Sequence, residues 1–219
     1  MLRHSAGVRL AHLLLVVTIG WLIISGLGVH EILPAPLIHR LGGHVLLVGS
    51  HRWLGYALAA ALLLALIFLW PRLREFFRAI LSFRRSDAAW LPGLLRSLVS
   101  PRSNPLPWHD GRFDPAQRLV FVVLIGSLAL LVVTGIAINF IPLSVRMAFA
   151  WTLRTHLAAA WVFIAALSVH VFAGLGLLPT HRGVTRAMFG DGRIKSDLGL
   201  RLWPDWTARK LAGKSRPRI

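Results

Sequence analysis

The chain has 219 residues, of which 56% are hydrophobic and only 15% are charged, and this composition excludes an ordinary soluble domain. Lysine and arginine outnumber acidic residues by 25 to 8, which gives a formal net charge of +17. The chain has no cysteine. Disulfides, thiolate metal sites and thioether-linked haem are therefore excluded, because each of them needs a cysteine.

Four stretches carry no charged residue, and they occupy positions 10–30, 53–71, 119–145 and 155–181. At 1.5 Å per residue, about 20 helical residues cross a hydrocarbon core of roughly 30 Å. We therefore predict an all-α membrane protein in which residues 1–219 form one domain, a bundle of four transmembrane helices. The predicted spans are about 10–30, 51–71, 119–143 and 153–178.

The basic residues are distributed unequally between the two sides of this bundle. Residues 1–10, 71–118 and 179–219 together carry 21 lysines and arginines, whereas the other two connections carry 4. Cytoplasmic flanks collect positive charge. We predict a multi-pass protein of the bacterial inner membrane with a cytoplasmic loop at 72–118, a cytoplasmic tail at 179–219 and both termini in the cytoplasm. The same placement explains the net charge without nucleic-acid binding.

The cytoplasmic loop contains two different patterns. Apolar residues recur at helical spacing from Leu73 to Leu81 beside several arginines, which predicts an amphipathic helix on the membrane surface. From position 90 to 115 the chain is rich in helix-breaking prolines, and we expect a loop there. These prolines are Pro92, Pro101, Pro105 and Pro107.

Four of the ten histidines lie in or beside the predicted spans at matching depths. His51 and His156 lie near the outer ends of the second and fourth spans, and His12 and His170 lie nearer the inner ends of the first and fourth. Fourteen residues separate His156 from His170, which in a helix is about 40° short of four full turns. The two histidines of the fourth span therefore share one face. Ionisable groups inside a bilayer are costly and usually functional.

Each pair of facing imidazoles can fill both axial positions of a haem iron. Without cysteine these would be two b-type haems that transfer electrons rather than bind oxygen. His44 lies seven residues before His51 on the same helical face, so either residue could be the ligand of the second span. Depth favours His51. We expect the remaining histidines to lie in loops or at interfaces. They are His4, His30, His39, His109 and His181.

The order and spacing of several motifs resemble the bacterial di-haem cytochrome b subunits, namely the gamma subunit of formate dehydrogenase, with relatives in nickel–iron hydrogenase and thiosulfate reductase. The resemblance covers most of the chain and rests on the following segments: Arg9-Leu-Ala-His12, His51-Arg-Trp-Leu-Gly55, Phe113-Asp-Pro-Ala-Gln117-Arg118, Thr134-Gly135, His156, His170 with Val171-Phe172, Met188-Phe-Gly-Asp-Gly192 and Trp203-Pro-Asp-Trp206.

The resemblance implies that His51 and His156 ligate an outer haem and that His12 and His170 ligate an inner one. It also implies a quinone site, with menaquinone or ubiquinone as substrate, at the stretch before the third span. Gln117 is retained there, whereas Asp114 and Ala116 replace the asparagine and glycine that are typical of the family. An acidic residue at this position can deliver protons or simply favour the helix N-terminus.

The resulting hypothesis is a membrane-anchoring electron-transfer subunit of an oxidoreductase complex, with no primary-substrate site of its own. By the resemblance, its partners are a periplasmic iron–sulfur subunit and a molybdenum or tungsten catalytic subunit, which we expect to be a formate dehydrogenase. The alternatives are a hydrogenase or thiosulfate reductase subunit, a self-contained cytochrome b, a haem-free membrane anchor and a proton-relay transporter. The transporter is disfavoured because the spans contain no carboxylate.

Overall fold

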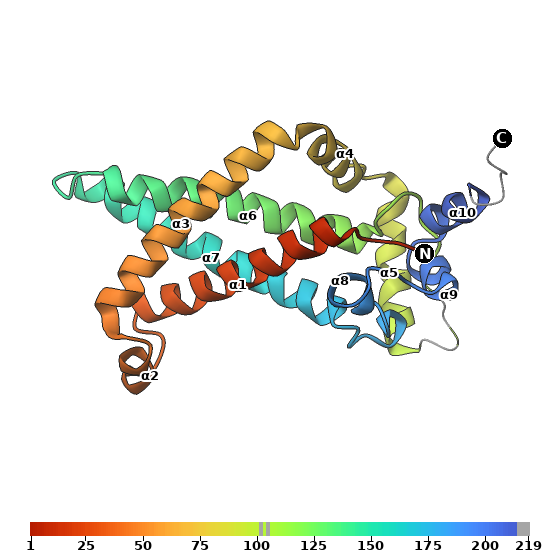
Figure 1. Cartoon of the computed structure of the whole chain (residues 1–219), viewed down its shortest axis with the longest axis horizontal. Helices are drawn as coiled ribbons and strands as arrows, with labels where there is room; N and C mark the ends of the chain where they lie inside the picture. The colour runs from red at the N-terminus through yellow and green to blue at the C-terminus, as the bar shows by residue number, and fades with distance from the viewer. Residues whose placement is uncertain (101–102, 104–105, 214–219) are drawn as a thin grey trace. The chain divides into compact units, whose positions relative to one another are not determined.

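The computed structural model describes residues 1–100, 103 and 106–213, and the described residues form a largely helical fold (Figure 1). The four longest helices are α1 (Ala6–Val29), α3 (Gly43–Phe68), α6 (Pro115–Phe140) and α7 (Arg146–Gly174). The shorter helices are α2 (Ala35–Arg40), α4 (Trp70–Ile80), α5 (Arg85–Val99), η1 (Pro179–His181), α8 (Arg186–Phe189), α9 (Ser196–Leu202) and α10 (Pro204–Ala212).

The four long helices, among the residues that are described, are long and apolar enough to cross a membrane. At most 11% of the most apolar window of each is buried against the rest of the chain. Exposed leucine, valine and isoleucine therefore cover most of their surface, which is stable in lipid but not in water. Over the described residues, the predicted all-α fold with four helices long and apolar enough to span a membrane is confirmed.

The four long helices begin before the apolar stretches that predicted them and end short of their C-terminal limits. α3 begins at Gly43 rather than near position 51, and α7 begins at Arg146 rather than near 153. Hydropathy marks the part of a helix that fits the hydrocarbon core, whereas the hydrogen-bonded backbone continues past it. α3 starts where Gly42 adopts a φ of 98°, a left-handed conformation that separates it from α2.

The connection between the second and third long helices is more ordered than the sequence suggested. The predicted amphipathic helix is present as α4. The predicted loop is wrong over its first ten residues, because residues 90–99, with Pro92 among them, belong to α5. Trp90 is buried, and its indole Nε1 donates a 2.8 Å hydrogen bond to the Pro107 carbonyl oxygen. This tertiary anchor offsets the backbone hydrogen bond that a proline removes. Pro101 and Pro105 lie outside the described residues.

α5 is also held at its N-terminal end by a buried ion pair. The Arg118 guanidinium contacts both carboxylate oxygens of Asp87 at 3.1 Å, and the Arg118 side chain is only 4% exposed. The other bond of this arginine goes to the Ser82 carbonyl oxygen. Asp87 in turn accepts a 2.9 Å hydrogen bond from the Arg84 backbone N–H, which caps α5.

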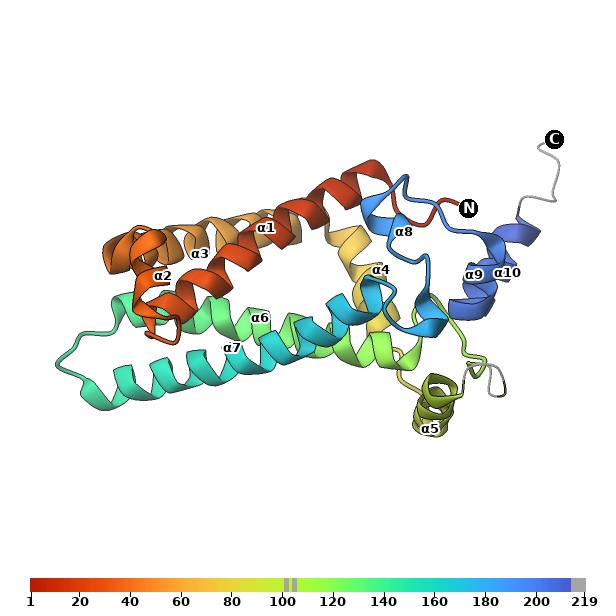
Figure 2. The ribbon, with the colours of Figure 1, turned by 90° about the horizontal axis from the view of Figure 1, so that it is seen from below.

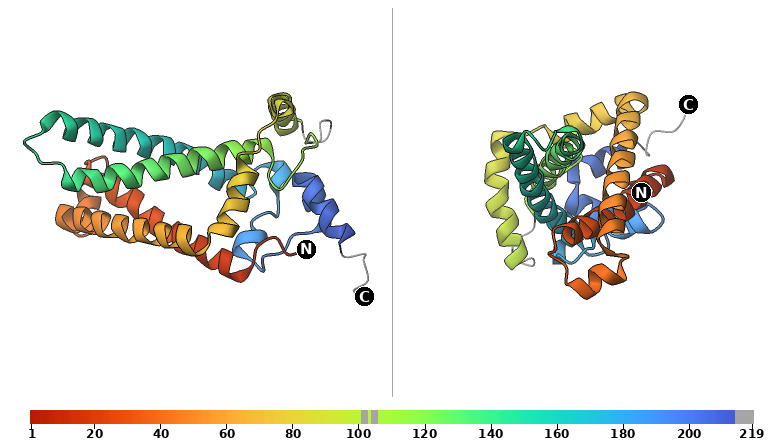
Figure 3. Two further views of the ribbon diagram at one scale, coloured as in Figure 1. Left: turned by 90° about the horizontal axis from the view of Figure 1, so that it is seen from above. Right: turned by 90° about the vertical axis from the view of Figure 1, so that its left-hand side faces the viewer.

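The chain divides into two compact units. The first, which we call the paired-helix unit, comprises Leu10–Leu73 and Ile125–Ile164. In it, α1 and α3 form one helical hairpin through α2, and α6 and α7 form a second through a short turn (Figures 2 and 3). α1 and α3 approach closely at Gly28, where an added Cβ would lie 2.5 Å from Leu47 Cδ1. Small residues permit such close helix contacts in membranes.

The second unit, which we call the terminal unit, comprises the described residues of Met1–Arg9, Arg74–Leu124 and Ala165–Ile219. Its N-terminal residues pair with the segment after α8, since Leu2 and Arg193 form an antiparallel bridge. A small apolar core lies among its helices and includes Ala187, Ile194, Leu198, Leu202 and Trp203. The segment after α7 is thus a packed element of this unit.

Candidate functional site

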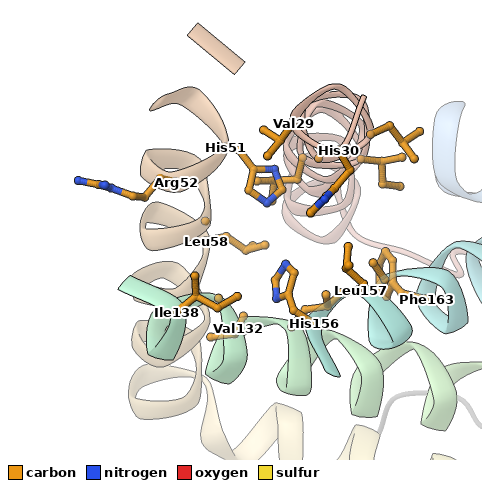
Figure 4. A pocket seen from close by; sticks show the side chains of 18 of the residues that line it. Val29, His30, His51, Arg52, Leu58, Val132, Ile138, His156, Leu157 and Phe163 are labelled. Atoms are coloured by element: carbon orange, nitrogen blue, oxygen red, sulfur yellow. The ribbon is translucent and has the colours of Figure 1, made fainter. Parts of the chain in front are cut away.

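Two histidines of the paired-helix unit face each other across an apolar cavity. His51 of α3 and His156 of α7 have ring centroids 6.4 Å apart, and their ring planes meet at 79°. Figure 4 shows the two imidazoles directed toward one another from their separate helices. The cavity around them has a volume of about 440 Å³, within the range of small-molecule sites. Its walls come from all four long helices and are mostly aliphatic and aromatic.

Each of these histidines is held by a hydroxyl group of the helix before it in the same hairpin. Nδ1 of His51 lies 3.0 Å from Ser25 Oγ on α1, and Nδ1 of His156 lies 2.9 Å from Thr134 Oγ1 on α6. Both hydroxyl-bearing residues are buried, with exposed fractions of 0% and 6%. Both hairpins therefore hold their histidine in the same way, through a contact at its Nδ1 atom.

A glycine follows each hydroxyl residue and leaves room for the neighbouring imidazole. An added Cβ at Gly26 would lie 3.1 Å from His51 Cε1, and one at Gly135 would lie 3.2 Å from His156 Cε1. Both distances are shorter than an ordinary carbon–carbon contact. The glycines thus allow the rings to lie flat against α1 and α6.

This arrangement fits a bis-histidine haem. Two metal–nitrogen bonds of about 2 Å, added to about 1 Å from each ring centre to its Nε2, give a centroid separation of roughly 6 Å when both rings bind one metal ion. The observed 6.4 Å agrees with this value. The donor set is two imidazoles, and the apolar cavity suits a porphyrin. The residues present therefore fit the cofactor that the sequence predicts.

The other histidine candidates of this unit lie in different surroundings. Nε2 of His44 lies 3.4 Å from Glu31 Oε1, and the His44 side chain is 45% exposed, so His51 rather than His44 faces His156. His30 lines the same cavity, which sequence reasoning missed (Figure 4). The half-buried His12 of α1 lines neither of the two cavities described here.

A second cavity, of about 510 Å³, lies within the terminal unit. The fourth predicted ligand, His170, lines it together with the three residues predicted for a quinone site, Asp114, Ala116 and Gln117. Phe121 packs against His170 with ring centroids 5.7 Å apart. The side chains that the sequence assigned to two neighbouring sites therefore share one cavity. His12 belongs to the paired-helix unit, so its predicted pairing with His170 stays a prediction.

Asp114 lies immediately before α6 and is 6% exposed. Its Oδ1 accepts a 2.8 Å hydrogen bond from the Gln117 backbone N–H. Burial raises the pKa of Asp114 above the ordinary carboxyl value, although the backbone hydrogen bonds and the nearby His109 and Arg118 act in the opposite direction. The carboxyl beside the cavity therefore holds its proton more tightly than a carboxyl in water does.

The side-chain amide of Gln117 has a defined orientation. The indole Nε1 of Trp203 donates a 2.9 Å hydrogen bond to Gln117 Oε1. Because an indole nitrogen only donates, the amide oxygen must face Trp203 and the amide NH₂ remains a donor for another group. Trp203 is itself stacked on the Arg3 guanidinium, whose carbon lies 3.9 Å from the ring centroid. Burial lowers the pKa of Arg3 to about 9.

Two further histidines line this second cavity, which the sequence analysis, expecting them in loops or at interfaces, did not predict. His109 is 5% exposed, and its Nε2 lies 2.8 Å from the Leu202 carbonyl oxygen. His181 is 7% exposed, and burial together with the charge of Arg201 lowers its pKa to about 4. His109 lies in the proline-rich segment and His181 lies beyond the predicted fourth span, so hydropathy offered no signal for either. Their proximity to Asp114 comes from packing within the terminal unit.

Comparison with known proteins identifies the family of the chain. No curated protein sequence matches the chain significantly. The family model described as prokaryotic cytochrome b561 matches residues 3–191, which include all four predicted haem ligands and the predicted quinone residues. Members of that family bind b-type haem and transfer electrons in membranes. The chain belongs to the prokaryotic cytochrome b561 family.

Proposed function

We propose that the chain is the membrane-anchoring di-haem cytochrome b subunit of a respiratory oxidoreductase, carrying electrons between a periplasmic iron–sulfur and catalytic module and the quinone pool at the cytoplasmic side. The convergence of His51 and His156, with centroids 6.4 Å apart in an apolar cavity, is the observation that carries the proposal. Membership of the cytochrome b561 family supports the haem chemistry.

In this proposal His51 and His156 hold the outer haem b, and His12 and His170 hold the inner one. A bis-histidine haem supplies reversible one-electron chemistry without an open coordination position. The protein holds the imidazoles, excludes water from the cavity and supplies an apolar wall. These residues select the cofactor by donor type, because neutral imidazole is a strong ligand for haem iron.

The second cavity is the proposed quinone site. Reduction of a quinone to the quinol takes up two electrons and two protons, so a site for it needs a hydrogen-bond donor for a carbonyl oxygen and a proton source. The NH₂ of Gln117, oriented by Trp203, is the proposed donor. The buried carboxyl of Asp114, favoured in its protonated form, is the proposed proton source. His170 on the same cavity supports electron transfer over a short distance.

The charges support the proposed orientation in the membrane. The 21 lysines and arginines in residues 1–10, 71–118 and 179–219, against 4 elsewhere, support a cytoplasmic location for these segments. The terminal unit contains these three segments almost entirely. The proposed quinone cavity then lies near the cytoplasmic face of the inner membrane, and protons consumed there come from the cytoplasm.

The proposed partner is a formate dehydrogenase that contributes an iron–sulfur subunit and a molybdenum or tungsten catalytic subunit, with hydrogenase and thiosulfate reductase as the alternative donors. Affinity purification from the native membrane tests the partner, because the catalytic subunit that co-purifies can be assayed with formate, hydrogen and thiosulfate in turn. Metal analysis distinguishes molybdenum or tungsten from nickel. A cytochrome that purifies alone, with full haem content, would instead support a self-contained electron carrier.

The quinone assignment is tested with the purified, chemically reduced cytochrome and a water-soluble quinone analogue, by following reoxidation of the haem absorbance. Gln117→Leu should slow reoxidation at least tenfold while the haem content stays unchanged. Ser86→Ala is a suitable control, since Ser86 does not line the cavity. Equal reoxidation rates for the wild type and Gln117→Leu would place the quinone site elsewhere.

A further inference from the structure

The two hydroxyl groups beside His51 and His156 have only one proton each, and their other contacts define where it lies. Ser25 Oγ lies 2.7 Å from the Trp21 carbonyl oxygen of its own helix, and Thr134 Oγ1 lies 2.6 Å from the Leu130 carbonyl oxygen. Two oxygens at such a distance require a hydrogen between them, and a carbonyl oxygen can only accept. Both hydroxyl protons are therefore directed at the backbone.

The contact to histidine must then be donated by the imidazole. Since the hydroxyl proton is already used, the Nδ1 atoms of His51 and His156 carry hydrogen and donate to the hydroxyl oxygens at 3.0 and 2.9 Å. A neutral imidazole with hydrogen on Nδ1 has its lone pair on Nε2. The hydrogen bond at one ring nitrogen thus determines which nitrogen is available to a metal ion.

We propose that Ser25 and Thr134 are positioning residues for the outer haem, each fixing the tautomer and the ring orientation of one axial histidine and increasing its donation to the iron. The inference rests on the proposed function, because it requires His51 and His156 to be haem ligands. It assigns a role at the haem site to two residues that do not themselves bind the iron. A hydrogen-bonded partner at the second nitrogen makes an imidazole a more basic ligand, and its loss typically weakens metal binding about 10- to 100-fold.

The repetition of the arrangement is the strongest argument for it. A buried hydroxyl alone often bonds to its own helix, which is a sufficient structural role. Here the same four elements occur in both hairpins: a hydroxyl, a carbonyl four residues earlier, a glycine one residue later and a histidine of the next long helix. Thr152 has the hydroxyl and the carbonyl alone: its Oγ1 donates to the Ala148 carbonyl oxygen at 2.8 Å, but Leu153 follows it and no histidine contact is present among the described residues.

The test is redox titration of the purified cytochrome carrying Ser25→Ala, Thr134→Val or both. Removing the acceptor reduces electron donation by the ligand and destabilises ferric relative to ferrous haem. We expect the midpoint potential of the outer haem to rise in each single variant. A tenfold loss of ferric preference corresponds to about 59 mV for one electron. The double variant should rise further, because both hydroxyls act on the two ligands of one haem.

The controls separate this inference from the proposed function. Thr134→Ser, which keeps the hydroxyl, should restore the wild-type potential, and Thr152→Val should leave it unchanged. If His51→Leu and His156→Leu retain all their haem, the proposed function fails. If those variants lose the outer haem but Ser25→Ala and Thr134→Val keep an unchanged or lower potential, the inference alone is overturned. If Ser25→Ala does not fold, the comparison of Thr134→Val with Thr134→Ser tests the inference.

Discussion

The ring centroids of His51 and His156 lie 6.4 Å apart, although the two residues belong to different hairpins and are separated by more than one hundred positions of sequence. The helix that carries each histidine does not by itself determine where the imidazole ring lies. Ser25 and Thr134 hold the Nδ1 side of each ring, and Gly26 and Gly135 give each ring space. The site is therefore built by pairwise packing within each hairpin and by the approach of the two hairpins.

The first prediction concerns the ligand on α3. Replacing His51 by leucine should remove one of the two proposed haems, because a single imidazole cannot fill both axial positions. Replacing His44, which lies beside Glu31, should leave the haem content unchanged. Pyridine haemochrome assay of the two purified variants measures the difference. A loss of haem in the His44 variant with full retention in the His51 variant would contradict the geometry.

A second prediction concerns the glycines. Gly135→Ala places a methyl group 3.2 Å from Cε1 of His156, so the ring must move by a few tenths of an ångström. We expect a stable protein with weakened haem binding and an altered low-spin spectrum, since ligand orientation is sensitive to such shifts. Gly49→Ala is the matched control, because an added Cβ there meets nothing within 4 Å. Identical spectra for the two variants would show that Gly135 has no role at the site.

The sequence predicted the four spans because length and apolarity are strong signals in a membrane protein. The pairing of His51 with His156 could be predicted from depth, since both lie near the same ends of their spans. By contrast, the contribution of Ser25 and Thr134 could not, because a hydroxyl in an apolar helix usually bonds only to its own backbone. The signal that could have identified them is that a hydroxyl residue is followed by a glycine in both segments, at Ser25-Gly26 and at Thr134-Gly135.

The terminal unit was harder to predict for a different reason. α5 was expected to be a loop because of Pro92, but the tertiary contacts of Trp90 and Asp87 outweigh the local cost. His109 lies in a loop, as expected, but it is buried there, and its Nε2 contacts the carbonyl oxygen of Leu202, 93 residues later. Contacts of such separation leave no periodic pattern in the sequence.

A third prediction concerns the pH dependence of quinone reduction. Burial raises the pKa of Asp114, so its protonated form persists above the ordinary carboxyl range, and proton donation should fall as the pH rises through the folded-state pKa. Asp114→Asn should turn over more slowly and lose this pH-dependent decline. Steady-state quinone reduction measured across the pH range provides the test, and an equally steep decline in the variant would assign it to another group.

The same group has a consequence for stability with a definite sign. Because the folded-state pKa of Asp114 is above its unfolded value, the folded state binds the proton more tightly, and stability is lost as the pH rises from the unfolded pKa through the folded one. Asp114→Asn should remove that loss. Thermal unfolding in detergent at several pH values should show a flatter pH dependence of Tm for the variant. A wild type with no decline would contradict the buried, protonated state.

A fourth prediction concerns the ion pair between Arg118 and Asp87, whose side chains are 4% and 13% exposed. Arg118→Met leaves the carboxylate without its partner, and a buried unpaired charge costs about 3 kcal/mol or more. The double variant Arg118→Met with Asp87→Asn should recover part of that loss. Unfolding curves of the wild type, both single variants and the double variant measure the coupling. Additive effects of the two substitutions would exclude a direct interaction.

The most direct test of the account is the haem content of the purified wild-type cytochrome, from its reduced-minus-oxidised spectrum and the pyridine haemochrome assay against protein concentration. We expect two b-type haems per chain, held by His51 with His156 and by His12 with His170. Folded protein that contains no haem after expression with sufficient haem supply would contradict it.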